Sequence, residues 1–333
     1  MKENNMKQNP KICDIAQLAD VKLSVLKEGK EAGVNIAQID NGSGLVFTVV
    51  LDRCMDLGKA SVDGKNVSWL SGTGYTNPSY FDAAGSGWLG SFFGGLLSTC
   101  GLMQVGSPCE DAGEKLGQHG RIGNMPAKNI KVNKYWKNGK YFLEITGVMN
   151  EIFALVENMQ LTRKITVIAG EKKIFINDIV ENCGTAAAPH MILYHFNFGY
   201  PLLDEKAVLN IPSSEVVGNG DAAEAAKKDC KNFGKPIPGF IEHVFYHEMK
   251  TAKNGDVKVG IENKKLNLGV TIKYNQKELP KFVEWKNPKK DVYVLGLEPG
   301  NCWTQGRAAE RKRGTLQFMR PGEVRKYNLE VNF

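Results

Sequence analysis

The chain has 333 residues, of which 42% are hydrophobic and 24% are charged, and its formal net charge is +7. These values are normal for a soluble globular protein whose core is large enough to need no disulfide or metal staple. The lysine clusters lack any helix-turn-helix, zinc-finger or aromatic–basic motif, so we expect no nucleic-acid partner.

The first part of the chain combines one weak helix signal with strand signals. Residues Met1–Lys11 are polar and lack the apolar segment of a secretory signal, and about the first ten residues are expected to be flexible. Asp14–Leu26 is a weak helix candidate, and Leu45–Leu51 is an apolar, β-branched strand candidate. The longest apolar stretch, Trp88–Met103, holds four glycines and is shorter than the ~18 apolar residues of a membrane helix, which favours buried strands.

Strand signals dominate the rest of the chain, because apolar and β-branched residues recur there at period two. The predicted strands are Tyr141–Thr146, Gln160–Ile168, Lys173–Val180, Leu266–Tyr274, Lys281–Trp285, Val292–Leu297 and Val324–Val331. Turn residues stand at Asp63-Gly64, Asn138-Gly139, Asn254-Gly255 and Pro321-Gly322. Asp221–Lys228 is a short, Ala-rich surface helix candidate. The predicted fold class is therefore all-β: one large β-sandwich domain over residues 1–333, with few short helices.

Seven cysteines are present, and no two of them are spaced as Cys-x-x-Cys. An odd number without that spacing argues against a disulfide framework and against a structural zinc site. We expect free thiols in a cytoplasmic protein, with no membrane segment. The basic net charge would favour an anionic small ligand, such as a sugar acid or a sugar phosphate.

Three stretches place an imidazole or a carboxylate in or beside an apolar run: Gln118–Arg121, Leu193–Tyr200 and Leu295–Asn301. Burying an ionisable group costs free energy unless the group is paired or used. Three such placements in one β-rich chain indicate a single site that contains an acid, a base and a binding group.

Five ordered blocks, which span most of the chain between Arg53 and Glu323, carry a family resemblance. The blocks are Asp52–Gly58, Gly94–Leu102, His119–Ala127, Leu193–Leu203 and Leu295–Cys302. They resemble the aldose 1-epimerase (galactose mutarotase-like) superfamily, in particular its divergent branch known as a domain of unknown function. The resemblance implies a super-β-sandwich with a concave sugar site across one sheet, and a mechanism that uses neither a metal nor a cofactor.

The order of the five blocks along the chain assigns the roles of the superfamily's site residues to residues of this chain. The resemblance implies that Glu298 is the general base and His195 the general acid. It also implies that His119 is a second, sugar-binding histidine, and that Arg53 or Arg121 is the sugar-binding arginine. The usual Asn-His pair before the acid is replaced by Tyr194-His195, and the substrate-binding Asp of the superfamily has no counterpart.

The acid–base role requires groups that titrate near the working pH. Histidine does so at ~6.5, whereas a glutamate starts near ~4.3 and needs partial desolvation. The apolar run Val294–Leu297 would desolvate Glu298, and Pro299-Gly300 would end the strand and leave the carboxylate at an accessible rim. From the residues alone, Glu298 could instead pair with an arginine such as Arg307, and His195 could be a satisfied core histidine.

Further residues are candidates for sugar contacts. His119 and Arg121 are two positions apart and would share a face of an extended segment, with Gly120 allowing close approach of a ligand. Arg53 could equally form an ion pair with Asp52 or Asp56. The remaining candidates for binding sugar oxygens, an anionic group or a sugar face are His247, Asn301, Arg307 and Trp285.

His247 lies four positions after His243, so the two share a face of a helix or a strand. No third ligand stands out near them in the sequence, and we expect no metal site.

The resemblance implies a cofactor-independent aldose 1-epimerase that interconverts the α and β anomers of a free sugar or sugar derivative by acid–base ring opening. Two alternatives stay open. One is a sugar isomerase, epimerase or lyase that uses the same His/Glu pair, and the other is a non-catalytic carbohydrate-binding protein. The sequence specifies neither the sugar nor the oligomeric state, and a homodimer is compatible with it.

Overall fold

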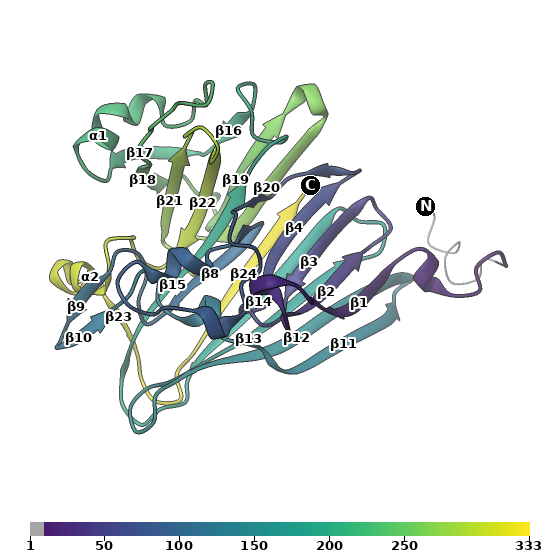
Figure 1. Cartoon of the computed structure of the whole chain (residues 1–333), viewed down its shortest axis with the longest axis horizontal. Coiled ribbons are helices and arrows are strands. Elements are labelled where there is room, and N and C mark those ends of the chain that lie inside the picture. The colour runs from purple at the N-terminus through teal and green to yellow at the C-terminus, as the bar shows by residue number, and fades with distance from the viewer. Residues whose placement is uncertain (1–9) are drawn as a thin grey trace.

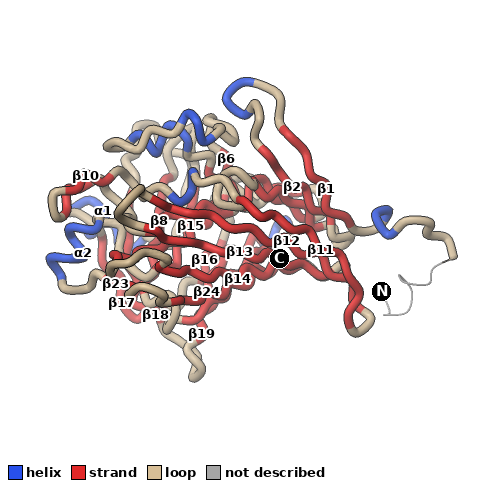
Figure 2. The backbone as a smooth tube through the Cα atoms, turned by 90° about the horizontal axis from the view of Figure 1, so that it is seen from below, coloured by secondary structure: helices blue, strands red, loops and turns tan. Residues whose placement is uncertain are grey.

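The computed structural model describes residues 10–333, and the expected flexibility of the first ten residues falls mostly on residues 1–9, outside the described part. Two large antiparallel sheets make up most of the molecule, which confirms the all-β prediction (Figure 1). Helical segments are short and lie at the periphery of the strands (Figure 2).

The larger sheet has twelve strands in the described chain. Their bounds are β1 (Asp20–Val25), β2 (Asn35–Asp40), β3 (Leu45–Val50), β4 (Asp56–Val62), β5 (Lys65–Asn66), β8 (Leu97–Leu102), β15 (Ala188–Phe198), β17 (Ser213–Gly218), β18 (His243–Met249), β21 (Lys281–Asn287), β22 (Val294–Gly300) and β23 (Gln317–Met319). The strand order is β1-β2-β3-β4-β8-β15-β22-β21-β18-β17, with β5 beside β4 and β23 beside β15. β15 and β22 therefore lie in the interior of this sheet.

The second sheet has eight strands in the order β11-β12-β13-β14-β24-β20-β19-β16. Their bounds are β11 (Lys128–Lys137), β12 (Lys140–Ile152), β13 (Asn158–Ile168), β14 (Lys173–Asn182), β16 (Val208–Asn210), β19 (Asp256–Asn263), β20 (Leu268–Asn275) and β24 (Val324–Asn332). Two small strand pairs join β6 (Trp69–Leu70) to β7 (Gly94–Gly95) and β9 (Cys109–Asp111) to β10 (Glu114–Leu116).

Of the two short α-helices, α1 (Asp221–Ala226) contacts β17 and β18 of the larger sheet, and α2 (Arg307–Arg313) contacts β9. The predicted helix over Asp221–Lys228 is confirmed as α1, which continues into the 3₁₀-helix η6. The 3₁₀-helices are η1 (Ile15–Gln17), η2 (Gly29–Glu31), η3 (Pro78–Tyr80), η4 (Gly87–Ser91), η5 (Ile122–Asn124), η6 (Lys227–Asp229) and η7 (Lys264–Leu266). No helix in the described chain has the length and apolarity that a membrane span requires.

Two local predictions were wrong. The weak helix over Asp14–Leu26 is a single 3₁₀ turn followed by β1, which pairs with β2 from Asp20↔Asp40 to Val25↔Asn35. Pairing with a neighbouring strand overrides a weak helical preference here. The strand before Pro299 does not stop there, because β22 continues through Gly300 and pairs with β21 from Asn287↔Val294 to Lys281↔Gly300.

The two sheets bury a large apolar core that also contains a polar cross-link. Arg163 of β13 is fully buried and binds Asp178 of β14 at 2.7 Å and Asp56 of β4 at 2.8 Å. The hydroxyl of Tyr194 on β15 donates to the same Asp178 carboxylate at 2.8 Å. Arg163 also donates to the carbonyl of Cys54 at 3.1 Å and to the hydroxyl of Thr99 at 2.9 Å. This network joins the two sheets behind β15, and removal of Arg163 would leave two buried carboxylates without their cationic partner.

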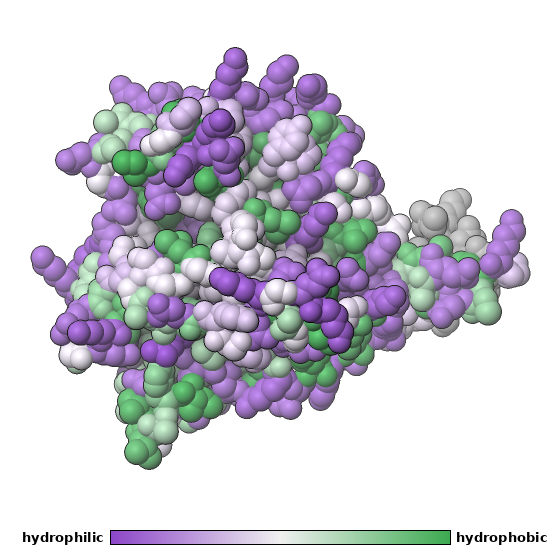
Figure 3. All heavy atoms as spheres, viewed as in Figure 1, coloured by the Kyte–Doolittle hydropathy of each residue, from purple (hydrophilic) through white to green (hydrophobic). Residues whose placement is uncertain are grey.

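The face of the molecule shown in Figure 3 is largely hydrophilic. Large apolar side chains that are exposed include Ile152, Leu155 and Val156, at the turn between β12 and β13.

Candidate active site

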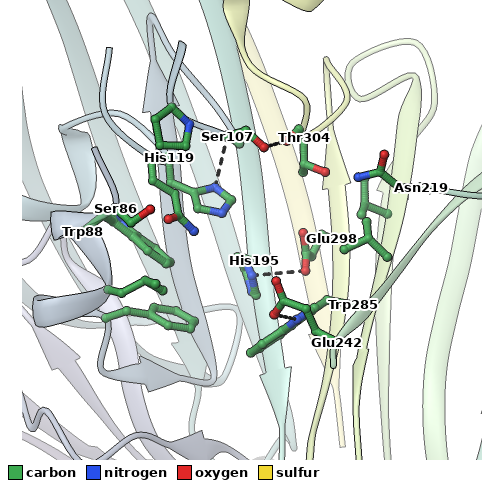
Figure 4. A pocket seen from close by; sticks show the side chains of 17 residues that line it. Ser86, Trp88, Ser107, His119, His195, Asn219, Glu242, Trp285, Glu298 and Thr304 are labelled. Carbon is green, nitrogen blue, oxygen red and sulfur yellow. Dashed lines mark hydrogen bonds and ion pairs between the residues drawn. The ribbon is translucent and has the colours of Figure 1, made fainter. Parts of the chain in front are cut away.

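A pocket of about 410 Å³ lies over the interior strands of the larger sheet. This volume is in the range of sites that hold small molecules. Figure 4 shows His195 and Glu298 at the centre, with Trp88 and His119 on one side and Asn219 on the other. The lining residues are Ser86, Trp88, Leu89, Phe92, Gly106, Ser107, Pro108, Gln118, His119, His195, Asn219, Glu242, Val244, Val283, Trp285, Glu298 and Thr304.

Strand register brings His195 and Glu298 together. β15 and β22 are antiparallel and pair Phe196 with Leu297 and Leu193 with Gly300, so His195 stands opposite Glu298. Side chains at opposite positions of neighbouring strands project from the same face. His195 Nε2 lies 3.2 Å from Glu298 Oε1. This oxygen and His195 Nδ1 have no hydrogen-bond partner in the described chain, so both groups remain available to a ligand.

Gly296 makes space for this pair. It precedes Glu298 by two positions and therefore lies on the same face of β22. A Cβ atom at Gly296 would stand 2.5 Å from Glu298 Oε1 and 2.9 Å from Trp285 Cβ. Neither neighbour could tolerate such a contact without moving, so the glycine is required by the carboxylate and the indole together.

Burial changes the acidity of both central groups. His195 is 5% exposed and Glu298 is 2% exposed. Desolvation, helped by nearby His119, lowers the pKa of His195 to about 3. Desolvation, helped by the negative charge of Glu242, raises the pKa of Glu298 well above its ordinary value. Both shifts favour the uncharged form of each group over an ion pair.

His119 enters the pocket from a loop that is fixed by the backbone. Its amide donates to the carbonyl of Gly106, and its carbonyl accepts from the amide of Gly101. The Gly106 amide also points at His119 Nδ1, at 3.4 Å, which leaves Nε2 as the protonated nitrogen of a neutral ring. Desolvation lowers the pKa of His119 to about 4, so the ring is neutral at physiological pH and can donate from Nε2.

Gly120 is required by the backbone of this loop and not by the approach of a ligand. Its φ is +73°, and a Cβ there would stand 2.3 Å from the carbonyl oxygen of Gly101. His119 itself has a φ of 56°, and Arg121 is the residue that caps η5. The segment is therefore not extended, and the prediction that His119 and Arg121 share a face was wrong: Arg121 lies over the ring of Phe153, 4.6 Å from its centroid.

Aromatic rings form the walls around the acid–base pair. The His195 ring lies between Phe92 and Trp285, with a centroid distance of 5.3 Å to each. Trp88 packs against His119 at 4.5 Å. Trp285 Nε1 donates to Glu242 Oε2 at 2.7 Å, which orients both the indole and an exposed carboxylate at the mouth of the pocket. Flat aromatic faces beside polar groups suit the apolar faces and hydroxyls of a sugar.

Four of the nine predicted site residues line the pocket, namely Glu298, His195, His119 and Trp285. The structure does not bring Arg53 there, because its guanidinium donates to the carbonyls of Gly123, Thr76 and Ser91 at 2.8 to 2.9 Å. Arg53 thus ties loops together and does not pair with either neighbouring aspartate.

Asn301, Arg307 and His247 also lie elsewhere. Asn301 Oδ1 accepts from the Ile192 amide at 2.8 Å, which braces β15. Arg307 binds Asp111 at 2.7 Å and also Glu114. His247 lies on the opposite face of the sheet, where its Nε2 is 3.0 Å from Glu284.

Sequence reasoning missed most of the uncharged polar lining. Ser86, Ser107 and Thr304 come from loops and carry no distinctive pattern. Glu242 directly precedes β18. Its position in the pocket lining follows from the pairing of β18 with β21, which the local sequence does not reveal. Gln118 stands next to His119 within a stretch that the sequence singled out, so this residue could have been named.

The charge of the pocket differs from the charge of the chain. Among the described residues that line it, two are carboxylates, Glu242 and Glu298, and none is a lysine or an arginine. The expectation of an anionic ligand, drawn from the net charge of +7, finds no cationic partner here. Net charge reports the whole surface, whereas a ligand in a pocket responds to the charges that line it.

A family comparison identifies the chain. The model of the family described as "Domain of unknown function (DUF4432)" matches residues 31–333. The chain belongs to the DUF4432 family. The match contains the pocket and both central residues of the acid–base pair. No protein of curated function matches the sequence.

Solved structures place this DUF4432 chain among galactose mutarotase-like folds. A candidate aldose 1-epimerase from Klebsiella pneumoniae is 27% identical, with a TM-score of 0.89 over 94% of this chain and 82% of that one. A galactose mutarotase-like protein from Clostridium acetobutylicum is 13% identical, with a TM-score of 0.65 over 95% of this chain and 100% of that one. Galactose 1-epimerase from Lactobacillus acidophilus is 11% identical, with a TM-score of 0.58 over 94% of this chain and 98% of that one. The predicted superfamily fold is confirmed.

Proposed function

We propose that this protein is a cofactor-independent aldose 1-epimerase that interconverts the α and β anomers of a sugar. The observation that carries the proposal is the His195–Glu298 pair, whose nearest nitrogen and oxygen are 3.2 Å apart. Ring opening of a hemiacetal needs a proton removed from the anomeric hydroxyl and a proton added to the ring oxygen. Both oxygens are bonded to the same carbon, so the acid and the base must lie close together, as these two groups do.

The reaction conserves protons. Glu298 takes the proton of the anomeric hydroxyl while His195 protonates the ring oxygen, and the bond from the anomeric carbon to that oxygen breaks. The open-chain aldehyde rotates about its first carbon–carbon bond, and the same steps in reverse close the ring with the other configuration. Because the two atoms are 3.2 Å apart, a proton can pass from a protonated Glu298 to His195 Nε2, which leaves the base deprotonated and the acid protonated.

The supporting groups fit this assignment. His119 can donate a hydrogen bond from Nε2 to a sugar oxygen, since its Nδ1 faces the Gly106 amide. Trp285 offers a half-buried aromatic ring, and the neutral side chains of Ser86, Ser107, Gln118, Asn219 and Thr304 can bind hydroxyls.

The substrate we propose is an uncharged sugar. The lining contains the exposed carboxylate of Glu242 and, among the described residues, no lysine or arginine, so a sugar acid or phosphate would meet repulsion without a compensating partner. The seven free thiols suit the reducing cytoplasm, where such sugars are metabolised.

Anomer exchange measured by NMR in D₂O tests the proposal. Neutral, acidic and phosphorylated sugars are each followed with and without the protein. We expect accelerated exchange for at least one neutral sugar, with every C–H signal retained. Loss of a C–H signal to deuterium would instead indicate an isomerase or a lyase, and binding without any acceleration would indicate a carbohydrate-binding protein.

A further inference from the structure

A second cluster of ionisable side chains lies behind the pocket wall. Val283 and Trp285 of β21 line the pocket, so Glu284 between them points to the opposite face of the sheet. His247 of β18 and Cys230, which follows η6, meet Glu284 there. One ligand atom from each of the three, a sulfur, a nitrogen and an oxygen, lies within 4.8 Å of the other two.

The cluster is buried and incompletely paired. The exposed fractions are 3% for Cys230, 1% for His247 and 0% for Glu284. Glu284 Oε2 lies 3.0 Å from His247 Nε2, but Glu284 Oε1 has no hydrogen-bond partner in the described chain. An unpaired oxygen on a fully buried carboxylate costs free energy, and a bound cation would offset that cost.

Ser213 holds the imidazole of His247 through a hydrogen bond to its Nδ1 nitrogen. Its hydroxyl oxygen is 2.7 Å from His247 Nδ1 and 3.3 Å from the carbonyl of Ile211. When the hydroxyl donates to that carbonyl, its oxygen accepts from Nδ1–H, and Nε2 is left with a lone pair directed at Glu284. In that arrangement Nε2 and Glu284 Oε2, which are 3.0 Å apart, both present lone pairs that a cation can bind. A hydrogen bond from the second ring nitrogen is the usual support of a ligating histidine.

Lys286 fixes the segment that carries Cys230. Its ammonium group donates to the carbonyls of Asp229 at 2.6 Å and Asn232 at 2.5 Å, one on each side of Cys230. These bonds hold the thiol beside β21. The lysine charge opposes a further cation, but a thiolate and the Glu284 carboxylate together supply two negative charges against it.

We propose that Cys230, His247 and Glu284 bind a zinc ion. The combination of a thiolate, an imidazole and a carboxylate suits zinc, whereas magnesium and calcium prefer oxygen ligands alone. The ion joins β18, β21 and the segment after α1, and it lies on the far side of the sheet from the pocket. Because the ligands are buried and do not line the pocket, the ion is structural, and this site is independent of the proposed reaction.

Titration of the full-length protein with cobalt tests the proposal, because Co²⁺ reports thiolate ligation through a near-ultraviolet charge-transfer band. The protein is first treated with a chelator. We expect one equivalent of Co²⁺ to bind with this band, Zn²⁺ to displace it, and Mg²⁺ and Ca²⁺ to leave it unchanged. Zn²⁺ should also raise the melting temperature of the chelator-treated protein.

Three variants separate this site from incidental binding. Cys230→Ser should lose the charge-transfer band, whereas Cys183→Ser, which alters an exposed thiol, should retain it. Glu284→Gln keeps the shape of the side chain and should weaken Co²⁺ binding at least ~10-fold. Wild-type protein without a stoichiometric thiolate band, or Cys230→Ser with an unchanged band, would overturn the proposal.

Discussion

His195 and Glu298 occupy a site in which burial disfavours charge on either group. The pKa of His195 falls to about 3 and that of Glu298 rises well above its ordinary value. The pair therefore keeps one transferable proton over a wide pH range. The His195 ring gains a second proton only in strong acid, because its pKa is about 3. The Glu298 carboxyl loses its proton only above its raised pKa.

The first prediction concerns the pH dependence of catalysis. A profile of kcat/KM should stay level as the pH falls through 6.5, the ordinary pKa of histidine, because neither pocket histidine gains a proton there. The acidic limb should appear nearer to pH 4, where His119 begins to titrate. Anomer exchange measured against the uncatalysed rate at each pH gives this profile. An acidic limb centred near 6.5 would contradict the assigned environment of the pair.

The second prediction concerns Glu242, whose carboxylate accepts from Trp285 Nε1. Glu242→Gln retains an acceptor for the indole and removes a negative charge from the pocket mouth. Inhibition of neutral-sugar exchange by a sugar acid should become about 10-fold tighter, which corresponds to ~1.4 kcal/mol of relieved repulsion. Glu248→Gln is the matched control, since Glu248 lies on β18 outside the pocket lining. Equal inhibition constants in both variants would show that Glu242 does not select against anions.

At the scale of elements, β22 provides the catalytic carboxylate and the space around it. Gly296→Ala would place a methyl group 2.5 Å from Glu298 Oε1. The third prediction is a loss of at least ~10-fold in kcat, because displacement of a catalytic group is costly. Gly269→Ala on β20 is the control, since its nearest contact would be 3.3 Å. Both variants are assayed for anomer exchange and for melting temperature. Full activity of Gly296→Ala would mean that the carboxylate position is not critical.

The Arg163 network links the two sheets directly behind the strand that carries His195. Arg163→Ala would leave Asp56 and Asp178 buried without their cationic partner. The fourth prediction is a loss of about 3–5 kcal/mol in the free energy of unfolding, measured by denaturant titration. Lys164→Ala removes the adjacent, largely exposed lysine, which is 3.9 Å from Glu144, and should cost less than ~1 kcal/mol. Similar losses in the two variants would refute the structural role of this network.

How much the sequence predicts differs between strands and loops. The predicted strands at Gln160–Ile168, Lys173–Val180 and Val324–Val331 are confirmed within a few residues as β13, β14 and β24. Their period-two pattern is contained in the residues of each strand itself, because each strand has one buried face. The orientation of Arg121 was not predictable, since it depends on the positive φ of His119 and on hydrogen bonds to Gly101 and Gly106, which are distant in the sequence.

At the scale of the whole molecule, the site is assembled by strand order. β8, β15, β22, β21 and β18 are neighbours in the larger sheet although they are spread over residues 97–249 and 281–300 of the chain. Family blocks led to His119, His195 and Glu298, which share the pocket. They could not exclude Arg53 and Asn301, because a polar residue in a family block can equally brace the fold, as these two do. Arg307, which lies past the last block, braces the fold through its ion pair with Asp111. The buried cluster of Cys230, His247 and Glu284 was likewise hidden, since His247 and Glu284 lie 37 positions apart in the sequence.

The central claim is that Glu298 acts with His195 to open and close a sugar ring. The most direct test is the rate of α–β exchange of the best neutral sugar with wild-type protein and with Glu298→Gln. Gln occupies the same volume as Glu but cannot accept the proton, so we expect a ~10²–10⁴-fold lower kcat with an unchanged melting profile. Exchange at the wild-type rate in Glu298→Gln would contradict the account.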